Sequence, residues 1–159
     1  AYGSIGSCSW AIGVASRALH EIAEIAKAGR TRMGSLPLRE QPEFQRNFGL
    51  HQTAVEAARI QLRSVFNEAV ELIESGAPDE DCSTAVRRSK SHANYIVKSV
   101  AKSATIFAWE ASGSAGMRNP SLLQRCFRDI YIGAGHQVYD DRNYCEFAKP
   151  ALGVEPAPF

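Results

Sequence analysis

The sequence has no long apolar run, no closely spaced pair of cysteines and no marked excess of charge of either sign. No stretch approaches the roughly 20 consecutive apolar residues that a membrane-spanning helix needs. The formal net charge is +1, so nothing points to nucleic acid or an anionic membrane as the main partner. The four cysteines are scattered, no CxxC pair exists, and the four histidines lack the spacing of zinc ligands. We therefore expect no membrane or nucleic-acid partner, no metal site, and cysteines that stay reduced in a cytoplasmic protein.

Strand-like alternation is also missing, and so are internal repeats and any linker that would divide the chain. Four long segments instead carry helical periodicity, over residues 7–28, 42–75, 79–111 and from about 119 to a point before Pro150. In the first segment the apolar stripe consists of Ile12, Ala15, Leu19, Ile22 and Ala26. With 159 residues, 45% of them hydrophobic, the chain is long enough for one ordinary domain. The prediction is an all-α fold, an up-down-up-down four-helix bundle.

Glycine, proline and acidic residues fall where the ends of these segments are expected. Gly29 follows the first segment, as glycine does at a helix C-terminus. Pro42 suits the first turn of the second segment, and Gly76 stops it. Acidic residues 79–81 favour a helix N-terminus at the start of the third segment.

The fourth segment contains the stretch LQRCFRDIYIGAGHQVYDD, in which two glycines closely precede one histidine. Its apolar stripe consists of Leu123, Phe127, Ile130 and Ala134. His136 lies on another helical face, directly after Gly133-Ala134-Gly135. A histidine on a helix is ordinarily structural or solvated. However, a glycine also lets another chain or a flat ligand approach the backbone closely, so both interpretations stay open.

Two further segments have a functional and a structural interpretation. The turn SGSAGMRNP lies between the third and fourth helices, where backbone N–H groups beside a helix N-terminus bind phosphate; it is equally compatible with a plain loop. Arg30 and Arg32 follow the first helix, and an arginine there either binds phosphate or simply suits the helix dipole. Trp10 and Trp109 are expected to be anchors of the core or of an interface.

Taken together, these motifs resemble the C-terminal helical domain of the acyl-CoA dehydrogenase superfamily. More narrowly, they resemble its type 2 branch of two-component flavin-dependent monooxygenases, which includes the oxygenase component of p-hydroxyphenylacetate hydroxylase and dibenzothiophene monooxygenase. The resemblance covers nearly the whole chain, and its most specific part is NPSLLQRCFRDIYIGAGHQVYDDRNY. AGRTRMG resembles the dehydrogenase pattern arginine-x-x-phenylalanine-glycine, with Met33 in place of the aromatic residue.

The resemblance implies that residues 1–159 form a single C-terminal helical-bundle domain of a longer flavoprotein. The family's N-terminal helical domain and middle β-domain would be absent from this sequence. The resemblance also implies reduced FMN or FAD as cofactor, O2 as co-substrate and a separate NAD(P)H:flavin reductase. A homotetramer with the bundles at its centre is expected.

By the same resemblance Arg30 would bind the flavin phosphate. Gly113, Ser114 and Gly116 would lie near the phosphate end or near a neighbouring subunit's cofactor.

His136 marks a departure from the dehydrogenases of the superfamily. They usually carry a catalytic glutamate shortly after the arginine–aspartate pair, whereas residues 130–139 contain His136 and no acid. Removal of an α-proton needs such a base, so the resemblance favours a monooxygenase with an aromatic small-molecule substrate. His136 would then hydrogen-bond the substrate or the flavin, or help to move a proton. Two alternatives remain: an acyl-CoA dehydrogenase whose base lies elsewhere, and a non-catalytic helical interaction module.

Overall fold

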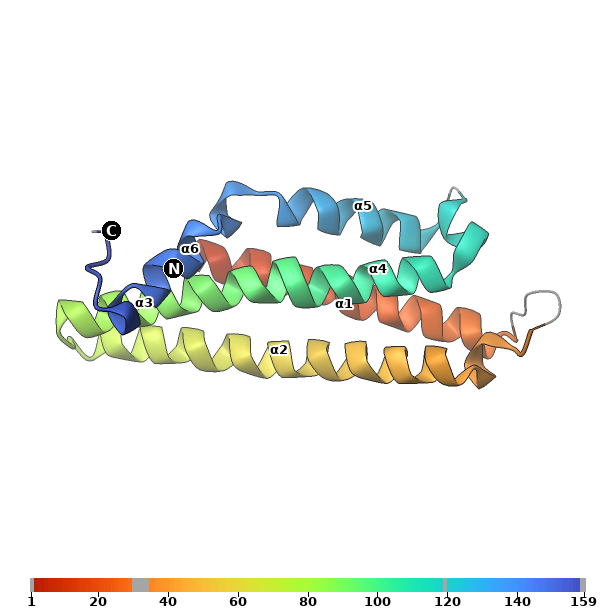
Figure 1. The fold of residues 1–159 in the computed structure, drawn as a ribbon, viewed down its shortest axis with the longest axis horizontal. Coiled ribbons are helices and arrows are strands. Elements are labelled where there is room, and N and C mark those ends of the chain that lie inside the picture. Colours follow the sequence, from red (N-terminus) through yellow and green to blue (C-terminus); the bar gives the residue numbers. More distant parts are fainter. Residues whose placement is uncertain (1, 30–34, 119, 158–159) are drawn as a thin grey trace.

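The computed structural model describes residues 2–29, 35–118 and 120–157. Four long rods lie side by side in this part of the chain, and successive rods run in opposite directions (Figure 1). The rods are α1 (Tyr2–Lys27), α2 (Pro42–Glu74), a continuous rod made of α3 (Asp79–Tyr95), a π-helix (Ile96–Ala101) and α4 (Lys102–Ala111), and α5 (Leu122–Ala134). The described residues contain no strand, and the all-α prediction is confirmed.

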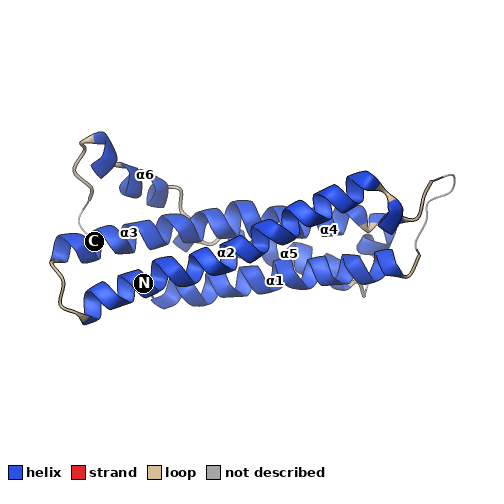
Figure 2. Cartoon of the chain, turned by 90° about the horizontal axis from the view of Figure 1, so that it is seen from below, coloured by secondary structure: helices blue, strands red, loops and turns tan. Residues whose placement is uncertain are grey.

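Short elements complete the structure. A last helix, α6 (Arg142–Ala148), packs on α3 and stands outside the bundle (Figure 2). Single 3₁₀ turns cover Leu38–Glu40, Gly113–Met117, Gln137–Tyr139 and Pro150–Leu152. No helix in the described ranges has the length and apolar character needed to cross a bilayer.

The first rod contacts each of the other three. The stripe expected from the sequence is confirmed, because its five members are at most 5% exposed. Cys8, Ala11 and Ala18 extend this stripe and are fully buried. Small side chains in these positions let the neighbouring helix backbones come close to α1.

The second rod ends where the sequence places its stop. Gly76 adopts a left-handed φ of 68°, which only glycine reaches without steric cost. The Gly76 N–H donates to the Ile73 carbonyl at 3.3 Å, and the Ala77 N–H donates to the Leu72 carbonyl at 3.1 Å. This pair of hydrogen bonds is the Schellman motif, which satisfies carbonyl groups at the end of a helix.

The third rod contains a π-helix that the sequence analysis did not predict. Its buried residues include a stripe that recurs every four positions and consists of Ala85, Ser89, Ala93, Val97, Ala101 and Thr105. In an α-helix of 3.6 residues per turn, each four-residue step rotates this stripe by about 40°. The wider π turn takes up roughly one extra residue, so the stripe keeps facing the core along the whole rod.

The fourth rod is shorter than predicted. A single helix was expected to run past His136 toward Pro150, but α5 ends at Ala134 and the chain bends before α6 begins. The backbone is extended at His136 (φ −68°, ψ 139°) and again at Asp140 (φ −66°, ψ 140°). The helical face assigned to His136 is therefore wrong, and His136 lies in a connecting segment.

Burial gives the protein a pH-dependent stability through two histidines. The His51 ring stacks on Phe107 at a centroid distance of 4.9 Å. His92 Nδ1 lies 3.0 Å from Gln61 Nε2, and its ring meets the edge of Phe147. Burial lowers the pKa of both histidines, and Arg88 lowers that of His92 further.

We expect the free energy of unfolding to fall as the pH decreases from about 7 to about 5. A depressed folded-state pKa means that the unfolded chain binds protons first, below its ordinary value near 6.5. The carboxylates with lowered pKa, Asp140 and Glu146, lose their contribution only at lower pH. Urea denaturation across this range checks the prediction. The double variant His51→Phe, His92→Gln should show a clearly weaker dependence, and an unchanged dependence would contradict it.

Candidate functional site

The predicted site residues lie at the two ends of α5. His136 follows the C-terminal end of this helix, whereas Gly113, Ser114 and Gly116 precede its N-terminal end. The helix has 13 residues and is therefore about 20 Å long. Arg30 lies outside the described residues. The connection between α1 and α2 that contains it begins and ends at the same end of the bundle as the glycine turn (Figure 1).

A cavity of 380 Å³ lies beside His136, between the N-terminal part of α1 and the C-terminal end of α5. Its lining residues are Ser7, Trp10, Gly133, His136, Val138 and Tyr139. Aromatic and apolar groups thus provide most of its wall, with a few polar groups among them. This size and composition are typical of a small-molecule site.

Gly133 is needed because Trp10 lies directly against it. A Cβ atom placed on Gly133 would overlap the six-membered ring of the Trp10 indole. The indole therefore packs on bare backbone, and it remains 41% exposed. A Cβ on Gly135 would meet its neighbours only at 3.5 Å or more. Within this chain, Trp10 is the flat group that approaches the helix at Gly133.

His136 is held in one orientation by the backbone. Its Nδ1 accepts a hydrogen bond from the Val138 N–H at 3.2 Å, and this bond caps the 3₁₀ turn Gln137–Tyr139. A ring nitrogen that accepts cannot carry the proton, so the neutral ring has its proton on Nε2. His136 is exposed, and its Nε2–H is left as a donor. The residue thus has a structural role as a cap and a polar group available to a ligand.

Tyr139 lines the same wall, and its hydroxyl is buried. The side chain is 2% exposed, and its hydroxyl makes no hydrogen bond to the described residues. Burial raises the pKa of Tyr139, and the nearby Ser7 side chain opposes this rise in part. Burial also raises the pKa of the neighbouring Cys8 to about 12. Both groups are therefore protonated at neutral pH, and a buried donor without a partner is uncommon.

The glycine turn at the other end of α5 has a structural explanation. Gly113 has a left-handed φ of 57°. A Cβ on Gly116 would overlap the Ser112 hydroxyl, and the Gly116 carbonyl accepts from Trp109 Nε1 at 3.2 Å. The structure thus accounts for Gly113 through its backbone conformation and for Gly116 through packing, and Ser114 is exposed. The role of these three residues in cofactor binding stays a prediction.

A model of the family described as "Acyl-CoA dehydrogenase, C-terminal domain" matches residues 5–141. The chain belongs to this family. It is 28% identical over 148 residues to indole-3-acetate monooxygenase of Pseudomonas putida, an alignment that covers 92% of the chain and 37% of that protein.

Solved structures share the fold of this acyl-CoA dehydrogenase C-terminal domain. The structure of 3-HSA hydroxylase from Rhodococcus sp. RHA1 matches with a TM-score of 0.82 at 19% identity, over 98% of the chain and 38% of that protein. XiaF from Streptomyces sp., solved with FADH2 and glycerol, matches with a TM-score of 0.83 at 18% identity, over 98% and 39%. The chain therefore spans less than two-fifths of the length of these relatives.

Sequence reasoning selected His136 but missed two of its neighbours in this domain. Trp10 was expected to be a core or interface anchor, and Tyr139 was given no role. Tyr139 reaches the cavity because the chain bends after Ala134, which periodicity did not predict, whereas Trp10 reaches it by packing on Gly133. Among the residues that the structure describes, no three His, Cys, Asp or Glu side chains are grouped as metal ligands.

We expect the variant Gly133→Ala to displace Trp10 from the wall of the cavity. The added methyl group overlaps the indole, and overpacking of this kind costs about 1–3 kcal/mol. In a Trp109→Phe background, the fluorescence of Trp10 should shift to longer wavelength and the free energy of unfolding should fall. Gly135→Ala is the matched control, since its methyl group has room. Equal behaviour of the two variants would contradict the proposed packing.

Proposed function

We propose that the chain is the C-terminal domain of a longer flavin-dependent monooxygenase that acts on an aromatic small molecule. The similarity to indole-3-acetate monooxygenase over 92% of the chain supports this proposal. When bound, reduced FMN or FAD supplies the activation of O2. The protein's own part is to bind the substrate, exclude water and place hydrogen-bond donors beside the reacting ring.

The composition of the cavity beside His136 carries the proposal. No described residue of its lining is a carboxylate. An acyl-CoA dehydrogenase needs a base that removes an α-proton, and a carboxylate ordinarily fills that role. In its place the lining contains the indole of Trp10, the imidazole of His136 and the side chain of Tyr139. This combination suits a planar ring that carries a polar acceptor.

The residues of this chain account for part of a flavin site. The 380 Å³ of the cavity lies within the range of ligand pockets and accommodates a ring system rather than a whole dinucleotide. His136 and Tyr139 would donate hydrogen bonds to a ring or substrate there. We propose that Arg30, together with Gly113, Ser114 and Gly116 at the other end of α5, contributes to binding the phosphate end of a cofactor. That cofactor would belong to this subunit or to a neighbouring one.

Partners of the whole enzyme follow from the same proposal. A separate NAD(P)H:flavin reductase would supply the reduced flavin. Self-association, with a homotetramer as the expected form, is supported by apolar side chains left on the surface of the chain, of which Ile60 is 72% and Ile132 is 78% exposed. All four cysteines are free thiols, which supports a reducing, cytoplasmic location.

The activity of the full-length protein tests the function directly. The protein is supplied with reduced flavin and O2 and screened against aromatic substrates, and the product formed per flavin oxidised is measured. His136→Ala should lower this yield by about tenfold or more while flavin oxidation continues, because a donor at the reacting ring is lost. His20→Ala is the control, because it removes an exposed histidine of α1 that lies away from this cavity. An unchanged yield would refute the role of His136, and oxidation of acyl-CoA thioesters instead would indicate a dehydrogenase.

We expect Tyr139→Phe to separate ligand binding from stability. Removing a buried hydroxyl without a partner should leave the free energy of unfolding unchanged or raise it by about 1 kcal/mol. The affinity for an aromatic substrate should fall by roughly five- to tenfold if the ligand accepts from this hydroxyl. Urea denaturation and equilibrium binding provide the two measurements, with Tyr144→Phe in α6 as control. Lower stability with unchanged affinity would show that the hydroxyl serves the fold, for example through Ser7.

A further inference from the structure

The residues nearest His136 have little hydrophobic anchoring. Gly135, His136 and Gln137 are exposed, so burial contributes little to their position. Tyr139, which is 2% exposed, anchors the segment in the core, and hydrogen bonds from the third rod hold the chain around it. Their centre is Asn94, a polar side chain at the end of α3 that is 0% exposed.

Asn94 uses both ends of its amide to hold this segment. Its Nδ2 donates to the Asp140 carbonyl at 2.7 Å. Its Oδ1 accepts from Asn143 Nδ2 at 3.0 Å, and the same Asn143 nitrogen donates to the Val138 carbonyl at 2.9 Å. The amide of Asn94 is thus satisfied in the interior, as a buried polar group must be.

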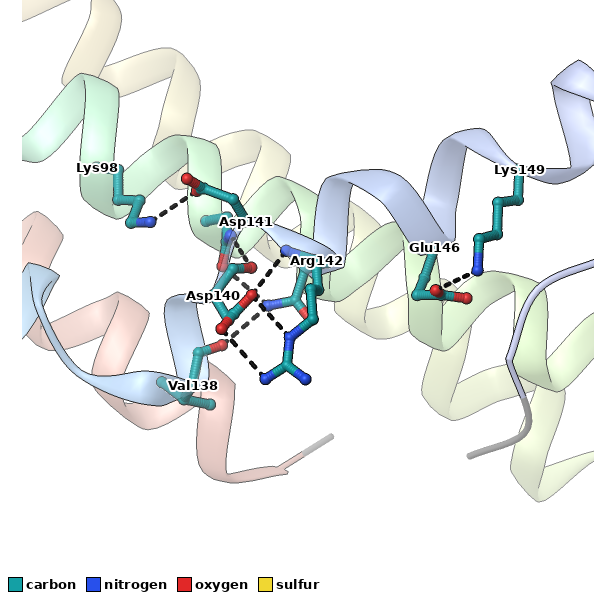
Figure 3. Close-up of polar contacts among 9 residues, drawn as sticks. Lys98, Val138, Asp140, Asp141, Arg142, Glu146 and Lys149 are labelled. Carbon is teal, nitrogen blue, oxygen red and sulfur yellow. Dashed lines mark hydrogen bonds and ion pairs between the residues drawn. The ribbon is translucent and has the colours of Figure 1, made fainter.

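A second anchor lies one turn further along the rod. Lys98, within the π-helix, pairs with the Asp141 carboxylate at 2.7 Å (Figure 3). Asp140 Oδ1 accepts from the Arg142 backbone N–H at 2.8 Å, and its carboxylate also pairs with the Arg142 guanidinium (Figure 3). The segment therefore contacts the third rod at Asp140, Asp141 and Asn143 and has an internal brace at Asp140.

These contacts continue to the ring of His136. Asn143 fixes the Val138 carbonyl, and the N–H of Val138 donates to His136 Nδ1. We propose that Asn94 and Asn143 are positioning residues that set the orientation and the Nε2–H tautomer of His136 toward the cavity. This proposal rests on the proposed function of His136 and extends it to residues that do not line the cavity.

The π-helix explains how one rod serves both the core and this segment. It begins two residues after Asn94 and contains Lys98. Without the extra residue, the rod's buried stripe would rotate away from the core over its length. With it, Asn94 stays buried against the His136 segment while Ala101 and Thr105 still face the bundle.

Amide hydrogen exchange tests the positioning without any cofactor or substrate. Asn143 is half-buried, so Asn143→Ala is less disruptive than a change at Asn94. In the full-length protein this variant should speed exchange at Val138 by about tenfold or more, while exchange at Val65 in the core of α2 stays unchanged. Asn67→Ala, which removes an exposed asparagine of α2, is the matched control. Unchanged exchange at Val138, or faster exchange at Val65 as well, would overturn the proposal.

A double-mutant cycle with His136→Ala tests whether the effect on function passes through the histidine. Asn143→Ala should lower product formed per flavin oxidised by about tenfold, since a small misplacement of a reacting group is costly. In the His136→Ala background the same change should matter by less than about twofold. Equal effects in both backgrounds would overturn the positioning role. If His136→Ala itself leaves the yield unchanged, the proposed function fails, and the exchange experiment still decides whether Asn143 holds the segment.

Discussion

Close packing against α1 is the constraint on which the rest of the structure depends. Ala11, Ala15 and Ala18 are fully buried, and α1 contacts α2, α4 and α5. Small side chains at these positions let three helices approach one. The same approach brings Trp10 onto Gly133 and closes the cavity beside His136. The wall of the site is thus a direct consequence of how the core packs.

The sequence predicted the rods well because their signals are local and redundant. Each rod carries an apolar stripe, and Gly29, Pro42 and Gly76 mark ends through backbone requirements that few other residues meet. The end of α5 was not predicted, because Gly133 and Gly135 are tolerated within helices and the apolar pattern gave no stop. The hydrogen bonds that hold the chain after Ala134 come from Asn94, about 40 residues earlier in the sequence, and no local pattern shows them.

Of the residues that line the candidate site, only His136 was predicted from the sequence as a site residue. His136 was conspicuous because two glycines closely precede it, and its place beside the cavity agrees with that choice. The reason given for the glycines was incomplete, since Gly133 accommodates Trp10 of the chain itself. Tyr139 and Asn94 look ordinary in the sequence, and their importance comes from burial. The interpretation of the glycine turn as a plain connection gains support, because backbone conformation explains Gly113 and packing explains Gly116.

The central claim is that this domain belongs to a protein that uses reduced flavin and O2 to oxygenate a substrate. The most direct measurement mixes the full-length protein anaerobically with reduced FMN or FAD and then with oxygen, following the absorbance in a stopped-flow spectrometer. The account predicts a transient species whose spectrum differs from both reduced and oxidised flavin and which outlives the reoxidation of free flavin. Reoxidation in a single step, at the rate seen without protein, would contradict it.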